Sequence, residues 1–242
     1  MLIQRIITAA VLVVIAILAV LELPAIYFSL FIALITLAAA WEWLELTSID
    51  SLFKKIQFLL LLILPMLGVT YWTVFLEMLA EILEWPEIKN YSDALEWLVI
   101  APVLFWILMM TLIRQSAPEL LKMQIKPGLQ SFMGWLVLIS AWMFLSKLRA
   151  FYGTGMVMYF LVLIWLADVS AYFTGKKWGK DQLSPEISPG KTVQGMYGAL
   201  ASAVLAGIGL RVYYGMAAFD QEGAELVVLM AVDLILLSVL TV

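Results

Sequence analysis

Residues 168–198 read DVSAYFTGKKWGKDQLSPEISPGKTVQGMYG, and this stretch separates two long apolar segments of the chain. It starts with a single carboxylate, Asp168, inside an apolar run, and it returns to apolar sequence after Gly195. Four lysines, two prolines and several glycines lie between these points. No other part of the sequence places so many polar groups between two segments of membrane length. The stretch therefore predicts a polar connection between two membrane helices.

The composition identifies lipid as the solvent for most of the chain. Of its 242 residues, 64% are hydrophobic and only 13% are charged, which is too apolar for an ordinary soluble domain. The chain has no cysteine and no histidine. Disulfides, thiolate metal sites, cysteine nucleophiles, histidine bases and the usual zinc ligands are therefore excluded. Any catalysis must use carboxylates, lysines, hydroxyls, backbone N–H groups or a hard metal ion.

Eight apolar runs are long enough to cross a membrane as helices, which takes about 17–25 residues each. We place them at 6–22, 25–46, 57–76, 97–113, 130–147, 155–173, 195–213 and 225–242. The second run follows the first without a cleavage site, so we expect a retained helix and a tight hairpin at 22–24. The predicted fold class is an all-α, polytopic integral membrane protein with about eight transmembrane helices. We expect one integral-membrane domain, residues 1–242.

The distribution of lysine and arginine predicts the orientation of these helices. With the N-terminus in the cytoplasm, 10 basic residues fall on inside segments and 4 on outside segments. We therefore predict an N-in, C-in topology, which places residues 174–194 in the cytoplasm, and we expect this segment to be a substrate-binding loop. This loop carries four lysines against Asp181 and Glu186, a net charge of 4 − 2 = +2. The positive-inside rule alone accounts for basic residues here, and ligand binding is the other interpretation.

Asp168 lies in a segment that is uncharged from Leu161 to Ala167. A carboxylate near lipid is costly unless it faces a cavity, a cation or a partner. Helical spacing puts it on one stripe with Trp165 and Tyr172. Two interpretations stay open: Asp168 binds a divalent ion or orients a substrate-binding lysine, or it forms a structural ion pair with one of the loop lysines.

The most distinctive part of the loop is the run Ser188, Pro189, Gly190, Lys191, Thr192. Proline fixes a turn, glycine lets backbone approach a ligand closely, and serine or threonine can cap the following helix. Free N–H groups at the start of that helix, beside Lys191, would bind an anion such as phosphate. A plain helix-capping turn is the alternative. The run is not a P-loop, because the first glycine of that motif would fall on a proline at position 185 and we expect no preceding strand.

Three other acidic features have a plain structural interpretation. Glu42 and Glu45 flank Trp43 near the expected cytoplasmic end of the second helix, where a Trp/Glu cluster would anchor that helix. The acidic segment 77–96 predicts a helix on the outer surface, with metal binding as the alternative. Asp233 lies inside the last predicted helix, where it faces a polar cavity or another helix.

Several motifs together carry a resemblance to a known family. They comprise Asp168, Ala171, Tyr172, Phe173 and Gly175, then Trp178, Gly179 and Lys180, then Leu183, Pro185, Ile187 to Thr192 and Gly195. In this spacing the chain resembles the bacterial phosphatidate cytidylyltransferase (CDP-diacylglycerol synthase) family. The segments 4–9 and 40–43 are similar to that family too, so the resemblance covers nearly the whole chain. Gln194 departs from the pattern, because the family typically has an acidic residue there.

The resemblance implies a reaction and a set of site residues. A phosphate oxygen of phosphatidic acid would attack the α-phosphorus of CTP and displace pyrophosphate, giving CDP-diacylglycerol for phospholipid biosynthesis. Asp168 and Lys191 would be the catalytic residues, with Mg²⁺ bound at Asp168. The implied substrate-binding residues are Lys176, Lys177, Ser188, Pro189, Gly190 and Thr192.

The resemblance also implies partners and a location. We expect CTP, phosphatidic acid and the lipid bilayer as partners, consider a homodimer, and expect no nucleic acid. The implied location is the bacterial inner membrane. The family's C-terminal signature, which holds further carboxylates and a histidine, does not follow the last predicted helix. We therefore expect a chain truncated at its C-terminus.

Other functions fit part of the pattern. A lone carboxylate among eight membrane helices would suit an ion-coupled transporter, which predicts broken helices and repeat symmetry. A CTP-dependent lipid kinase would need the same anion site. A non-catalytic membrane scaffold is the third alternative.

Overall fold

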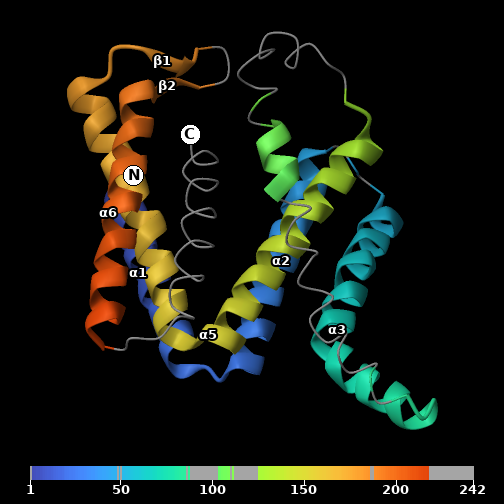
Figure 1. Cartoon of the computed structure of the whole chain (residues 1–242). Coiled ribbons are helices and arrows are strands. Elements are labelled where there is room, and N and C mark those ends of the chain that lie inside the picture. Colours follow the sequence, from blue (N-terminus) through green and yellow to red (C-terminus); the bar gives the residue numbers. More distant parts are fainter. Residues whose placement is uncertain are drawn as a thin grey trace. The chain divides into compact units, whose positions relative to one another are not determined.

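The computed structural model describes residues 2–47, 49, 51–85, 87, 103–109, 111, 125–185 and 188–217. The elements in chain order are α1 (Leu2–Glu22), α2 (Ala25–Leu46), α3 (Leu52–Ile82), α5 (Pro127–Trp178), β1 (Gln182–Ser184), β2 (Ser188–Thr192) and α6 (Val193–Ala217) (Figure 1). In this part of the chain α2, α3, α5 and α6 are long and apolar enough to cross a membrane. The prediction of an all-α membrane protein is confirmed, with one small hairpin of strands added to it.

The surface of these helices is apolar. Large side chains such as Leu34, Leu64 and Leu205 are more than 60% exposed, at 67%, 63% and 68%. A water-soluble protein rarely exposes so much continuous apolar surface, whereas lipid tails would cover it at no cost. The protein is therefore a multi-pass membrane protein.

The described helices can be compared with the predicted spans. The runs at 25–46, 57–76 and 195–213 coincide with α2, α3 and α6, the run at 6–22 lies in α1, and those at 130–147 and 155–173 both lie in α5. Residues 103–109 and 111 are helical, as the run at 97–113 requires. The run at 225–242, with Asp233, lies outside the described residues. The short link predicted at 22–24 is confirmed, because α1 ends at Glu22 and α2 begins at Ala25.

Helix α5 is two helices joined at one residue. Gly153 has φ 77° and ψ −172°, a backbone conformation open to glycine and closed to residues with a side chain. We call residues 127–152 the first arm and residues 154–178 the second arm. Each arm has about 25 residues and a length of about 38 Å, enough to cross a bilayer. Residues 148–154, which lie between the predicted spans 130–147 and 155–173, are helical except at Gly153.

The chain forms two compact units, residues 1–102 with 124–158, and residues 103–123 with 159–242. In the first unit, α2, α3 and the first arm of α5 share one hydrophobic core. The fully buried members of this core include Ala40 and Leu44 of α2 and Leu62 of α3, and Trp142 of α5 is 2% exposed.

Indole N–H groups tie these helices together through backbone carbonyls. Trp135 Nε1 donates to the Leu61 carbonyl at 2.8 Å, and Trp142 Nε1 donates to the Ser29 carbonyl at 3.1 Å. The first of these bonds has a particular cause. In an α-helix the Leu61 carbonyl would accept from residue 65, but residue 65 is a proline inside α3 and has no N–H. Trp135 supplies the donor that Pro65 lacks.

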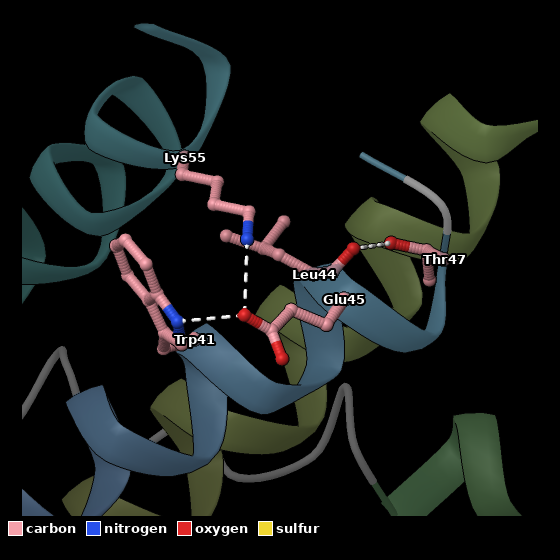
Figure 2. A network of polar contacts seen from close by, with 5 residues as sticks. All are labelled: Trp41, Leu44, Glu45, Thr47 and Lys55. Atoms are coloured by element: carbon pink, nitrogen blue, oxygen red, sulfur yellow. Dashed lines mark hydrogen bonds and ion pairs between the residues drawn. The ribbon is translucent and has the colours of Figure 1, made fainter. Parts of the chain in front are cut away.

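A second polar contact joins the end of α2 to the start of α3 (Figure 2). One oxygen of Glu45 accepts from Trp41 Nε1 at 2.9 Å and from Lys55 Nζ at 3.2 Å. Lys55 Nζ also lies 4.6 Å from the centroid of the Trp41 ring, a cation–π distance. Glu45 therefore links two helices, which favours the anchoring interpretation of the Trp/Glu cluster. Trp43 is part of the same anchor, because its indole N–H donates to the Gln130 carbonyl of α5 at 3.1 Å.

The Trp135 bond can be tested by a double-mutant cycle. Trp135→Phe is expected to lower the free energy of unfolding by about 1–3 kcal/mol, because it leaves the Leu61 carbonyl without a donor. Pro65→Ala restores the helix's own N–H, so the same tryptophan change should cost about 1 kcal/mol less in that background. Reversible unfolding in detergent micelles measures both values. Trp142→Phe is the control. Its indole bonds to the Ser29 carbonyl, and no proline lies four residues after Ser29. The effects of Trp142→Phe and Pro65→Ala on the free energy of unfolding should therefore add.

Candidate functional site

The second unit carries the polar stretch of residues 168–198. The second arm of α5 and α6 pack through Leu163, Ala203, Tyr159 and Ala206. In the sequence between α5 and α6, β1 and β2 form an antiparallel pair in which Gln182 pairs with Thr192 and Ser184 pairs with Ser188. Figure 1 shows this hairpin beyond the end of α5 and the start of α6. The connection between the helices thus runs from 179 to 192, shorter than the predicted loop of residues 174–194.

The strands are the main difference from the sequence analysis. We expected a turn at 188–192 and no preceding strand, but these five residues form β2, and β1 precedes position 185. The run still differs from a P-loop, because Gly190, Lys191 and Thr192 lie in a strand of a two-stranded antiparallel sheet. Proline and glycine are poor strand formers, so their sequence signal favoured a turn.

The helices approach closely where the hairpin joins them. A Cβ atom on Gly195 would lie 2.9 Å from the Ala171 carbonyl oxygen, and one on Gly175 would lie 2.9 Å from Thr192 Oγ1. A side chain on Gly198 would overlap Thr174. Small residues permit such backbone contact between membrane helices. The glycines of the motif therefore let α5 and α6 meet directly below the hairpin.

Thr192 is the N-cap of α6. Its Oγ1 accepts from the Gly195 N–H at 3.1 Å, the bond expected of a capping threonine. The predicted helix cap is thus confirmed at Thr192. The neighbouring Val193 N–H donates to the Asp181 carbonyl at 3.0 Å. Two of the first three N–H groups of α6 therefore have partners within the protein, contrary to the free N–H groups that we expected as an anion site.

The part of β2 that faces outward is the run Pro189, Gly190, Lys191, which is exposed, whereas Ser188 and Thr192 at its ends are half-buried. A Cβ atom on Gly190 would meet no atom within 4 Å. A ligand could thus approach the backbone at Gly190 next to the Lys191 ammonium group. The side of the strand that carries the predicted phosphate-binding residues is accessible.

Lys176 and Lys177 lie in the last turn of α5 and not in a loop. Hydropathy falls at these lysines, so the predicted span ended at 173 while the helix continues to Trp178. Lys176 Nζ lies 5.5 Å from the Tyr172 ring centroid, and Lys177 Nζ lies 4.6 Å from that of Trp178. Cations at a helix C-terminus interact favourably with the helix dipole. The two ammonium groups are thus held beside aromatic rings at the base of the hairpin.

Asp168 lies in the second arm of α5, seven residues before Gly175, and is exposed. Seven residues are close to two helical turns, so Asp168 shares a face with Gly175 and lies about 10 Å from it along the axis. No described residue forms an ion pair with Asp168, so the structural ion pair with Lys176, Lys177, Lys180 or Lys191 is not seen. Asp168 and Lys191 are at different heights of the same unit.

The structure adds residues that the sequence analysis did not place in the site. Gln194, noted only as a departure from the family pattern, bonds to Lys180 and Asp181 at the base of the hairpin. Gln182 Nε2 donates to the Pro189 carbonyl at 3.1 Å. Both contacts depend on the pairing of β1 with β2. That pairing was not visible in the sequence because the strands are three and five residues long.

The second unit thus presents a lysine-bearing strand, anchored at a junction of two membrane helices, with a lone carboxylate on the helix below. These features define a multi-pass membrane protein with lysines gathered at one end of a pair of helices. The model of the cytidylyltransferase family matches residues 3–242, and the chain belongs to that family. The prediction of a nucleotidyltransferase is confirmed, and the transporter and scaffold alternatives are not supported.

Relatives of the chain carry names that agree with this family. The chain is 33% identical over 202 residues to a phosphatidate cytidylyltransferase of Pseudomonas aeruginosa, a match that covers 83% of this chain and 67% of that protein. It is 30% identical over 220 residues to the enzyme of that name from Haemophilus influenzae, covering 85% of this chain and 71% of that protein. A shorter match to the Bacillus subtilis protein of the same name is 48% identical over 54 residues. No solved structure matches the chain.

The glycine contact below the hairpin generates a stability prediction. Gly195→Ala is expected to lower the free energy of unfolding by about 1–3 kcal/mol, because the added methyl group meets the backbone oxygen of Ala171 and separates the helices. Gly209→Ala in the same helix is the matched control, since a Cβ there meets nothing within 4 Å. The control should be neutral or raise stability by up to about 1 kcal/mol. Equal effects of the two changes, measured by unfolding in micelles, would contradict the close contact.

Proposed function

We propose that the chain transfers the cytidylyl group of CTP to phosphatidic acid, giving CDP-diacylglycerol and pyrophosphate. The observation that carries the proposal is the accessible run Pro189, Gly190, Lys191 on a strand anchored between two membrane helices. Membership of the cytidylyltransferase family supports the transferred group. The names of the relatives, at 30% and 33% identity, support phosphatidic acid as the acceptor.

The chemistry needs no general base. A phosphate oxygen of phosphatidic acid attacks the α-phosphorus of CTP, a new P–O bond forms, and the bond to the bridging oxygen of the β-phosphate breaks. The nucleophile is already an anion, so the absence of histidine and cysteine is no obstacle. Phosphoryl-type transfer depends mainly on positioning and on neutralising charge. Lys191 and the backbone at Gly190 hold phosphate oxygens at the hairpin, with Ser188, Pro189 and Thr192 setting the shape of the strand.

Lys176 and Lys177 provide the second part of the proposed site. They add two positive charges to the last turn of α5, next to the junction that carries β2. A basic cluster at the end of a membrane helix attracts anionic headgroups and nucleotides. We propose that these lysines draw CTP and phosphatidic acid to the same end of the helix pair.

We propose that Asp168 holds Mg²⁺. Its carboxylate lies in a predicted membrane span and has no ion pair with a described residue, and a carboxylate there requires a cation, a cavity or another partner. No group of three or more acidic residues that could hold a metal is found in the described ranges. Mg²⁺ keeps several waters and is commonly bound through one or two carboxylates plus substrate phosphates. A bound Mg²⁺ would neutralise charge on the CTP phosphates.

We propose the bacterial inner membrane as the location, with eight helices and both termini in the cytoplasm. The distribution of 10 basic residues against 4 supports this orientation. The relatives come from bacteria, which supports a bacterial membrane as the location. The cytoplasmic face is where CTP is available, and the hairpin must therefore lie there. A homodimer stays a prediction.

Loss of either proposed catalytic residue should stop the reaction. In the protein expressed from its native gene, Lys191→Ala and Asp168→Asn are each expected to lower CTP-dependent formation of CDP-diacylglycerol by about 100-fold or more, a barrier increase of about 2.7 kcal/mol. Radiolabelled CTP with phosphatidic acid in mixed micelles measures the product. Lys54→Ala and Glu22→Gln remove the same charges in the first unit and should leave the rate within about twofold. Full activity in both site variants would refute the site.

The orientation can be tested with cysteine labelling, because the native chain has no cysteine to remove. Pro185→Cys, at the exposed end of β1, should resist a membrane-impermeant maleimide in intact cells and react after the inner membrane is opened. Leu83→Cys, which follows α3 and is 57% exposed, should react in cells whose outer membrane alone has been made permeable. The reverse pattern would place the hairpin away from cytoplasmic CTP and reject the topology.

A further inference from the structure

Gln194 makes three hydrogen bonds at the base of the hairpin. Its Oε1 accepts from the N–H of Lys180 at 3.0 Å and from the N–H of Asp181 at 3.3 Å. Its Nε2 donates to Asp181 Oδ2 at 2.9 Å. One side chain from the first turn of α6 thus holds the two residues that precede β1. Both ends of its amide group are in use.

Only an amide can make this set of contacts. A carboxylate at position 194 could accept from the two backbone N–H groups, but it could not donate to the Asp181 carboxylate. Two carboxylates at this distance would repel each other. An alanine would lose all three bonds. The glutamine at position 194 is therefore matched to the aspartate at position 181.

The contacts lie where the hairpin is fastened to the helices. Asp181 is followed by Gln182, which pairs with Thr192, and the Asp181 carbonyl accepts from the Val193 N–H at 3.0 Å. Residues 180–182 are therefore bound to residues 192–194 from both the backbone and the Gln194 side chain. Lys191 is the next residue along β2. Because Lys191 immediately precedes Thr192, movement of residues 180–182 relative to residues 192–194 would also move the Lys191 backbone.

We propose that Gln194 is a positioning residue that holds the hairpin base so that β2 presents Lys191 to the CTP phosphates. This inference rests on the proposed function of the hairpin and names a residue outside the phosphate-contacting set. A binding surface that is already in place loses less entropy when the ligand arrives. Loosening the base should therefore weaken CTP binding more than it slows the bound complex, since Gln194 itself contacts no reacting atom.

The test is a charge change and its rescue. In the native-gene protein, Gln194→Glu is expected to raise the KM for CTP about tenfold, with kcat changed by less than about threefold. Asp181→Asn added to the same chain supplies a donor to the new carboxylate and should return the KM to within about threefold of the wild type. Asp181→Asn alone should be near the wild type, because its amide oxygen can still accept from Gln194. Gln57→Glu, an exposed site on α3, controls for the added charge.

Hydrogen exchange of the Lys180 and Asp181 amides gives a readout that does not depend on turnover. Their protection should fall in Gln194→Glu and return in the double variant. An unchanged KM with unchanged protection in Gln194→Glu overturns the proposal, and so does a raised KM that Asp181→Asn fails to restore. A fall in melting temperature with an unchanged KM assigns Gln194 a structural role only and also overturns it. Wild-type protein that makes no CTP-dependent product refutes the proposed function instead, and the exchange data then decide the hairpin contact alone.

Discussion

The architecture of the second unit depends on the contacts of one side chain, that of Thr192. Its hydroxyl caps α6 by accepting from Gly195, and it lies where a side chain on Gly175 would be. This is possible because residues 175 and 195 have no Cβ, so the two helices meet backbone to backbone. The strand that ends at Thr192 is therefore held against both helices at once. A loop tethered only through its own backbone would lack that constraint.

This constraint explains how a short hairpin can be held in one place without a large sheet. The hairpin is short, and its sheet has only two strands. Its order comes from the helix junction below it, from the pairing of β1 with β2 and from the Gln194 contacts. The middle residues of β2 are exposed, while the residues at its two ends are half-buried against the protein. The middle of this five-residue strand is thus accessible, while its two ends are held by the protein.

The sequence predicted the helical membrane class and the positions of several described helices, whereas the roles of the site residues stay predictions. Long apolar runs are decided by burial in lipid, which composition measures directly. The hairpin is decided by contacts between residues ten or more positions apart, such as Gln182 with Thr192 and Gln194 with Asp181. Proline and glycine at positions 189 and 190 disfavour a strand, but the pairing of β2 with β1 forms one there. The helical position of Lys176 and Lys177 was missed for a related reason, because hydropathy marks the end of the membrane and not the end of the helix.

The proline of α3 has a consequence for the biogenesis of the protein. The donor that satisfies the Leu61 carbonyl is 74 residues further along the chain, on a helix that the ribosome makes later. Until the first arm of α5 enters the bilayer, α3 carries an open acceptor in its middle, and hydrocarbon offers nothing to fill it. The nascent α3 is thus incomplete by itself, and the arrival of Trp135 is the event that closes its hydrogen-bond ladder. The position of Pro65 thus makes the completion of α3 depend on a helix that is synthesised later.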